Sequence, residues 1–305
     1  MRSLSAAGTT FILLTALLAG LASPVVAREK LGYGRLISND VLGDGRDRWR
    51  TGSVASSRVW GPSWTGSLPD TPGDLLELRF LGQIIGPDDL NSPAPGDRRY
   101  ATALSLGLHS HFDLGGLETA IGGDLVMTGE ETGLPDFQDA LHDLLGVEGP
   151  SDGTRAAAVA SGLHPTLVLE SGRSFAAGRT ELRPFVEGRV GDETLLRAGL
   201  DISFGQLGRG ELLVRDPVTG QRYRVVRDEG ARGASFVMGG DIARVASSIY
   251  LSDGELQEER SRLRAGMHWQ GARSSGFYGL TWMGEEFSGQ DEGQLIGSVR
   301  LKFEF

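Results

Sequence analysis

Five polar residues could together hydrolyse an ester. Asn39 and Asp40 precede a glycine-rich loop, Thr51 follows it, and His142 and Glu148 lie further along the chain. Carboxylate and amide oxygens suit a hard cation such as Ca²⁺, whereas a single imidazole is too few ligands for a zinc site. A histidine beside such a cation can deprotonate a water molecule, while the metal stabilises the oxyanion that develops on the ester.

Each of these features also has an ordinary structural explanation. Asn-Asp before glycines is typical of a turn, and a single loop histidine usually has no catalytic role. We interpret His109 and His111, which share one strand face, as lumen residues because no third ligand accompanies them. His164 near a strand start and His268 in mid-strand receive no role, and no G-x-S-x-G motif supports serine catalysis.

The elements that would position these groups are β-strands. Residues 295–305, L-I-G-S-V-R-L-K-F-E-F, alternate apolar and polar side chains and end on an aromatic residue. In an outer-membrane β-barrel, lipid wets one face of every strand and a polar lumen the other. The pattern therefore predicts a transmembrane antiparallel β-barrel. A soluble β-sandwich with its polar face in water is the alternative.

Twelve stretches of the sequence can be interpreted as strands of this barrel. A membrane crossing needs about 10 residues, so roughly 280 residues suit about a dozen strands with their loops. The predicted strands are 31–39, 51–60, 74–84, 100–112, 115–128, 162–171, 179–190, 194–204, 234–250, 258–270, 274–285 and 293–305.

The connections divide between the two ends of the barrel. Both termini of a single-chain barrel face the periplasm, so the long connections 40–50, 85–99 and 129–161 should face outside, together with the polar residues above. The connection 205–233 should be periplasmic, and nothing in the sequence explains its length. Residues 216–220 look like the tip of a hairpin.

The third outer loop contains a predicted helix. Pro135 is at the first helical position, Asp136 lies at the positive end of the dipole, and Gly146 is placed as the C-terminal cap. Gln138 and His142 are four residues apart and share a neighbouring face. The apolar stripe consists of Phe137, Leu141, Leu144 and Leu145.

The first 27 residues have the pattern of a secretory signal peptide. Arg2 provides the charged start, 11–22 the apolar core, and 25–27 a small-residue cleavage site. The core is too short for a membrane-spanning helix, which needs about 20 residues, although an inner-membrane anchor is the alternative. Residues 28–305 are then expected to form a single barrel domain with active-site loops at its outer end.

Composition excludes some classes of function. The chain has no cysteine, so neither a disulfide framework nor thiol chemistry is expected. The net charge is −10 and the charges are spread without basic blocks, which makes nucleic acid an unlikely partner.

Short blocks of residues in the first half of the chain resemble the ordered signature blocks of the lipid A 3′-O-deacylase (LpxR) family. The similarity covers about residues 31–150, and beyond them only the alternation of a barrel continues. The blocks are Ser38-Asn39-Asp40, Asp47-Arg48-Trp49-Arg50-Thr51-Gly52, Gly82-Gln83-Ile84-Ile85-Gly86-Pro87, Gly96-Asp97-Arg98-Arg99-Tyr100-Ala101 and Phe137-Gln138-Asp139-Ala140-Leu141-His142.

The resemblance implies a twelve-stranded bacterial outer-membrane barrel that removes the 3′-linked acyl(oxyacyl) group of lipid A. Its site, with Ca²⁺, would face the extracellular leaflet, and its substrate would be lipopolysaccharide of the outer membrane. Apart from the resemblance, we expect the protein to be a monomer. Asn39 and Asp40 match the family's pair at the metal, Thr51 its strand-2 threonine, and His142 its general base. Glu148 matches a carboxylate near the calcium.

The sequence also departs from the family's pattern. Arg50 replaces a tyrosine, Pro150 replaces another, and 88–92 is acidic where a basic residue is expected. Arginines could replace the missing phosphate contacts; the candidates are Arg46, Arg48, Arg98 and Arg99. A non-catalytic barrel, porin-like or structural, and a phospholipase that acts on ordinary phospholipids are the alternative functions.

Overall fold

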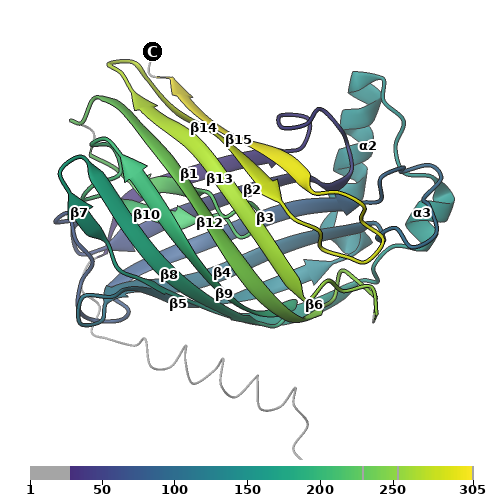
Figure 1. Cartoon of the computed structure of the whole chain (residues 1–305), viewed down its shortest axis with the longest axis horizontal. Helices are drawn as coiled ribbons and strands as arrows, with labels where there is room; N and C mark the ends of the chain where they lie inside the picture. Colours follow the sequence, from purple (N-terminus) through teal and green to yellow (C-terminus); the bar gives the residue numbers. More distant parts are fainter. Residues whose placement is uncertain (1–27, 229, 253, 304–305) are drawn as a thin grey trace, which may run out of the picture.

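Twelve long antiparallel strands close into a barrel in the computed structural model, which describes residues 28–228, 230–252 and 254–303 (Figure 1). β1 pairs with β15 over Ile37–Asn39 and β6 pairs with β8, so the sheet closes on itself. The strands are β1 (Glu29–Asn39), β2 (Trp49–Gly61), β3 (Leu75–Gly86), β4 (Ala101–Asp113), β5 (Glu118–Thr128), β6 (Gly162–Gly172), β8 (Thr180–Val190), β9 (Glu193–Phe204), β12 (Gly233–Ser248), β13 (Glu259–Gln270), β14 (Ser274–Met283) and β15 (Gln294–Phe303).

The predicted transmembrane β-barrel is confirmed, and each predicted strand corresponds to one of these twelve. A short strand, β7 (Phe175–Ala177), extends the pairing along β8. The proposed signal segment 1–27 lies outside the described residues.

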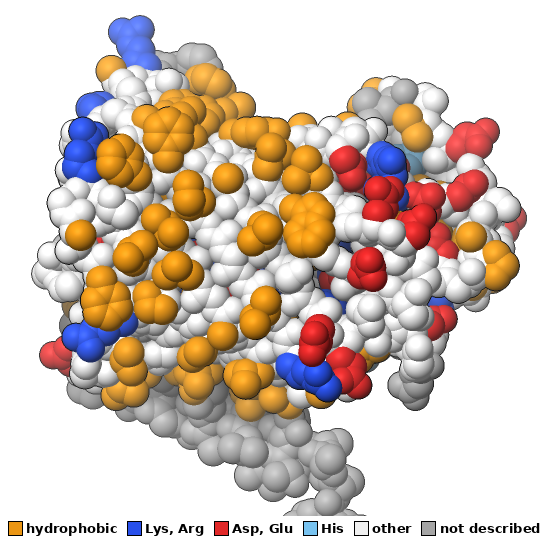
Figure 2. All heavy atoms as spheres, in the orientation of Figure 1, with side chains coloured by type: hydrophobic (Ala, Val, Ile, Leu, Met, Phe, Trp, Pro, Cys, Tyr) orange, Lys and Arg blue, Asp and Glu red, His pale blue; other side chains and the backbone are white. Residues whose placement is uncertain are grey.

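Side chains alternate between the outer surface and the lumen as their types predict. Leu106, Leu196 and Leu263 point outward and are more than half exposed, whereas Arg197 on β9 and Arg262 on β13 are buried inside. Figure 2 shows apolar side chains over the outer wall of the barrel. A surface of this kind is suited to contact with lipid.

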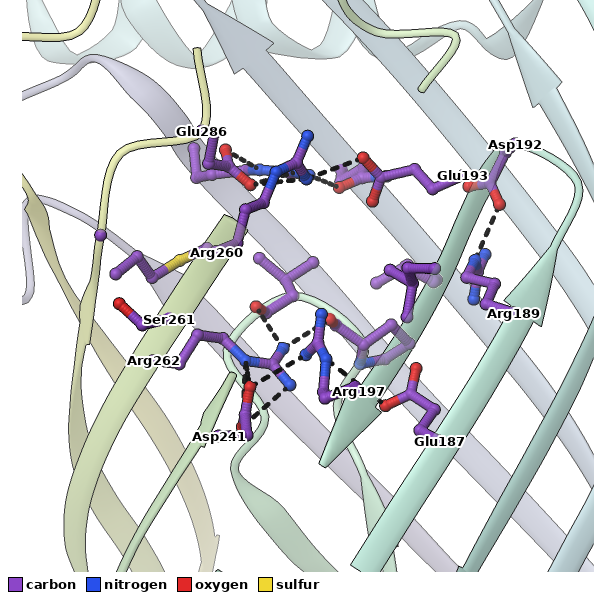
Figure 3. A pocket seen from close by; sticks show the side chains of 18 residues that line it. Glu187, Arg189, Asp192, Glu193, Arg197, Asp241, Arg260, Ser261, Arg262 and Glu286 are labelled. Carbon is purple, nitrogen blue, oxygen red and sulfur yellow. Dashed lines mark hydrogen bonds and ion pairs between the residues drawn. The ribbon is translucent and has the colours of Figure 1, made fainter. Parts of the chain in front are cut away.

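Charged side chains of the lumen form ion pairs with one another, as Figure 3 shows for one pocket. Arg197, Arg262 and Arg264 all contact Asp241. The cavity beside Arg197 and Arg262 measures about 40 Å³, whereas a larger one beside Arg264 measures about 530 Å³. His109 also lies in the lumen, where its ring bonds to Asp124 at 2.8 Å. The interpretation of His109 as a lumen residue agrees with this contact.

The long connection 205–233 folds back into the barrel as a plug. Its two short strands, β10 (Leu212–Arg215) and β11 (Arg222–Val226), form a hairpin of which Tyr223 and Val225 are completely or almost completely buried. The Tyr223 hydroxyl lies 2.7 Å from that of Ser57 on β2. The length of the connection is therefore explained, because the hairpin occupies the lumen.

Two glycines of β1 make room for this plug hairpin. A Cβ atom on Gly32 would lie 2.1 Å from the carbonyl oxygen of Val225, and one on Gly34 would lie 2.8 Å from the ring of Tyr223. Real Cβ atoms do not approach so closely, so any larger residue at Gly32 requires the backbone of the hairpin to move.

The helices lie together at one end of the barrel, opposite the C-terminus (Figure 1), which we call the helix end. They are a 3₁₀ turn, η1 (Glu130–Thr132), α2 (Leu134–Leu145) and α3 (Asp152–Ala156). Gly146 caps α2 with φ of 68°, as predicted. No helix among the described residues is long and apolar enough to cross a membrane.

Candidate active site

The first site loop connects β1 to β2 at the helix end. Asn39 pairs with Gly52, and the amide of Asp40 donates to the carbonyl of Thr51, so the loop begins where the ladder ends. Trp49 anchors the far side of the loop, buried with its ring 6.1 Å from that of Phe287. Its φ of 52° is left-handed, a strained conformation for a bulky residue, which the surrounding packing holds in place.

Oxygens of Asn39 and Asp40 converge at the base of this loop. Both Oδ1 atoms accept the same hydrogen bond donor, the amide of Val41, at 2.8 and 2.9 Å. The other oxygen of Asp40 accepts from the amide of Arg48 at 2.7 Å. The predicted pair is therefore brought together, and short backbone hydrogen bonds hold it.

Three carboxylates surround this point. Burial raises the pKa of the Asp40 carboxyl to about 8, and repulsion from Asp47 and Asp44 acts in the same direction. Burial also raises the pKa of Asp47. Closely spaced carboxyls of this kind attract a cation, and the oxygen donors are those that Ca²⁺ prefers.

His142 lies on the face of α2 that points toward the barrel, and only 7% of its surface is exposed. Its Nδ1 lies 3.0 Å from the backbone carbonyl oxygen of Glu148, and its Nε2 lies 3.5 Å from Oδ2 of Asp47. Since a carbonyl only accepts, Nδ1 carries the proton and Nε2 of the neutral ring is the basic atom. Asp47 is the carboxylate between the two groups: its charge raises the pKa of Asp40, and His142 partly opposes the rise in the pKa of Asp47 itself.

Thr51 and Glu148 are placed differently from the other predicted residues. The Thr51 hydroxyl is buried and donates to the carbonyl of Ile84 at 3.2 Å. The Glu148 side chain is exposed and accepts from Asn91 at 2.8 Å, so its visible link to the site is the carbonyl that holds His142. Among the described residues, no three histidine, aspartate and glutamate side chains form a group that could hold a metal ion.

Most of the arginines proposed as phosphate ligands are paired within the protein. Arg46 and Arg48 both contact Glu292, at 2.6 and 3.0 Å. Arg98 is fully buried and lies 2.8 Å from Glu286. These three arginines already pair with carboxylates, which argues against the proposed phosphate contacts. Of the four, only Arg99 has no ion pair in the described part of the chain.

Arg50, where the pattern of the resembling LpxR family has a tyrosine, is surrounded by hydrogen-bond partners inside the barrel. It donates to Glu286 at 2.8 and 2.9 Å and to Gln83 at 3.0 Å, entirely inside the barrel. The substitution therefore belongs to a buried ion cluster in which Glu286 also contacts Arg98 and Arg260.

Gln294 is a site residue that the sequence reasoning missed. It is buried at the start of β15 and donates to the carbonyl of Arg48 at 2.6 Å and to Asp40 at 3.4 Å. A signal existed, because barrel closure pairs the first strand with the last and places the start of β15 beside the end of β1. Asp47 was noted in its loop, but nothing in the sequence indicated that it faces His142.

Comparison with known proteins identifies solved structures with a similar fold. No protein-family model matches the chain, and a search of curated proteins finds no match. Among solved structures, LpxR from Salmonella typhimurium superimposes with a TM-score of 0.68 and 15% sequence identity, over 90% of this chain and 100% of that chain. This chain has the LpxR fold. At such identity the likeness is one of fold, and the chemistry rests on the site residues themselves.

Two autotransporter barrels are less similar than the LpxR fold. The translocator domain of NalP from Neisseria meningitidis has a TM-score of 0.38 and 13% identity, over 98% of this chain and 95% of that chain. The β domain of the Bordetella autotransporter BrkA has a TM-score of 0.38 and 11% identity, over 90% and 99%.

Proposed function

We propose that this protein is a calcium-dependent hydrolase of the bacterial outer membrane that removes the 3′-linked acyl(oxyacyl) group of lipid A. The helix end would face the extracellular leaflet, and a monomer would suffice because one chain supplies every proposed residue. The observation that carries the proposal is the placement of His142, whose basic Nε2 faces Asp47 at 3.5 Å, on the loop that begins with the converging Asn39 and Asp40 oxygens.

His142 would act as the general base. The Glu148 carbonyl fixes its tautomer, and Nε2 then takes a proton from the water that attacks the ester carbonyl. The 3.5 Å separation from Asp47 is longer than a good direct hydrogen bond, so both groups can contact one water and orient it. Asp47 would also stabilise the imidazolium that forms.

Ca²⁺ bound by Asn39, Asp40 and Glu148 would stabilise negative charge on the substrate oxygen. Two of these residues already present converging oxygens. Thr51 would orient groups at the start of β2. The Glu148 carboxylate, which contacts Asn91 in this structure, would have to turn toward the other two.

The test is mass spectrometry of lipid A from cells that express the protein, with and without a chelator. Wild type should release the 3′-linked acyl group, while His142→Ala and Asp40→Ala should leave lipid A intact. His164→Ala is the matched control, since this histidine contacts Thr128 on the barrel wall instead. Heat-modifiable gel migration checks folding. Normal deacylation by a folded His142→Ala variant would overturn the proposal.

The alternative functions predict other results. A porin-like role conflicts with the plug hairpin, in which Tyr223 is completely buried. A phospholipase would use the same base and cation, so phospholipids in the same extract serve as the second readout. Release of phospholipid acyl chains, with lipid A unchanged, would favour the phospholipase.

A further inference from the structure

Helix α2 presents three chemically distinct faces, and the first is fixed against the barrel. Gln138 is 3% exposed and accepts a hydrogen bond from the Tyr100 hydroxyl at 2.6 Å. His142, one turn later, is similarly buried. The polar side of the helix therefore packs inward, which is the reverse of the usual arrangement in a soluble protein.

The second face is apolar and uncovered. At 3.6 residues per turn, Phe137, Leu141 and Leu144 fall on one stripe beside the buried face. Their exposed fractions are 60%, 40% and 81%, and Val147 just beyond the helix is 50% exposed. If the stripe faced water, these large apolar side chains would not gain the favourable free energy of transfer from water to an apolar environment. That transfer is the dominant stabilising effect in folding.

The third face is acidic. Asp136, Asp139 and Asp143 recur at the same helical spacing, on the side of the helix away from the apolar stripe. Asp136 and Asp143 are exposed, and Asp139 pairs with Arg155 at the surface. Apolar, wall-facing and charged residues thus occupy three separate faces, each covering about a third of the helix.

Helix α2 lies where its apolar stripe adjoins the apolar outer wall of the barrel. α2 runs across the long axis of the barrel at the helix end (Figure 1). Just before it, the Thr132 hydroxyl donates at 3.0 Å to Thr102, on the outward face of β4. On that face Leu106, 55% exposed, follows Thr102 by four residues, which is about 13 Å along a strand. The outer apolar surface of the barrel therefore begins beside α2.

We propose that α2 is an interfacial helix whose apolar stripe inserts among the acyl chains of the adjacent leaflet. A helix in the plane of the membrane, with one apolar and one charged face, is the arrangement expected at such an interface. The acidic face meets water, and the stripe extends the lipid contact of the barrel wall around the proposed site. The occupant of the stripe is membrane lipid.

The chain contains no cysteine, so each single-cysteine variant can carry one nitroxide label without further changes. Phe137→Cys, Leu144→Cys and Asp143→Cys are labelled in the full chain, with Leu106→Cys as the lipid reference. In vesicles of phosphatidylcholine and phosphatidylglycerol, electron paramagnetic resonance measures how often each label collides with oxygen, which partitions into lipid, and with a water-soluble nickel chelate.

Labels at Phe137 and Leu144 should resemble the Leu106 label, with oxygen collisions several-fold favoured over nickel, whereas the Asp143 label should show the reverse. Equal nickel access at Leu144 and Asp143 would overturn the proposal. Low access to both reagents with dipolar broadening would also overturn it, since a second copy would then cover the stripe. The readout needs no catalysis, so it is independent of the proposed lipid A hydrolysis.

Discussion

Nδ1 of His142 lies 3.0 Å from the backbone carbonyl oxygen of Glu148. This contact turns the basic nitrogen toward Asp47 and depends on the main chain of residue 148, not on its side chain. In the proposed site, the side chain of Glu148 and its carbonyl would therefore have separate functions, which mutation can distinguish.

Glu148→Gln should raise the calcium concentration needed for half-maximal activity, because it removes a proposed ligand charge but keeps the carbonyl that orients His142. A calcium titration of deacylation measures the change, with Asn91→Ala as the control for loss of the side-chain contact. An unchanged calcium dependence in Glu148→Gln would limit Glu148 to its backbone contribution.

Asp47→Asn should lower kcat while the barrel remains folded. The amide cannot stabilise the imidazolium of His142, and general acid–base catalysis contributes typically about 10²–10⁴-fold, so we expect a loss of about tenfold or more. Asp143→Asn is the matched variant, since this residue follows His142 on α2 but is exposed on the acidic face. Equal effects of the two substitutions would argue against a direct role for Asp47.

Gly32→Val should displace the plug hairpin, because its Cβ would lie 2.1 Å from the Val225 carbonyl oxygen. Planar-bilayer recordings should show little steady conductance for wild type and open-channel events for the variant. Gly188→Val on β8 is the control, since a Cβ there meets nothing within 4 Å. Conductance of wild type equal to that of Gly32→Val would mean that the hairpin does not close the lumen.

Leu144→Ser should reduce hydrolysis of lipid A embedded in vesicles more than hydrolysis of lipid A dispersed in detergent. The side chain is 81% exposed and makes no described contact with the reacting residues, so its effect should come through the membrane. The ratio of the two activities is the measurement, and Asp143→Ser is the matched substitution. A parallel loss in both media would place Leu144 in the catalytic machinery instead.

Arg50→Met should destabilise the barrel by about 3 kcal/mol, because it removes one of the arginines that pair with the buried Glu286 carboxylate. Arg46→Met should leave stability unchanged, since its pair with Glu292 is exposed to solvent. Urea unfolding followed by heat-modifiable migration compares the variants. Equal midpoints would show that Arg98 and Arg260 alone satisfy Glu286.

The barrel was predictable because its physical cause is local. Lipid outside and polar groups inside impose a period of two on every strand, so the alternation over 194–204 already located β9 (Glu193–Phe204). The helix was equally local, since Pro135 and Gly146 act through backbone conformation at its two ends.

The plug and the contacts of the site depend on distant residues, so sequence patterns could not predict them. The hairpin tip near Asp216 was visible, but its place in the lumen depends on Gly32 and Gly34 at the start of the chain. The contact between His142 and Asp47 joins two separate loops. The spacing of the arginines did not reveal that Glu292 and Glu286 neutralise three of them.

The plug hairpin in the lumen also limits the routes by which a lipid could reach the site at the helix end. With Tyr223 and Val225 packed against the wall, the hairpin obstructs the interior of the barrel. Under the proposed function, a lipid substrate would therefore arrive sideways, by diffusion within its own leaflet, and a released acyl chain would depart the same way. The rate of encounter would then vary with the surface density of the lipid, not with its concentration in the surrounding water.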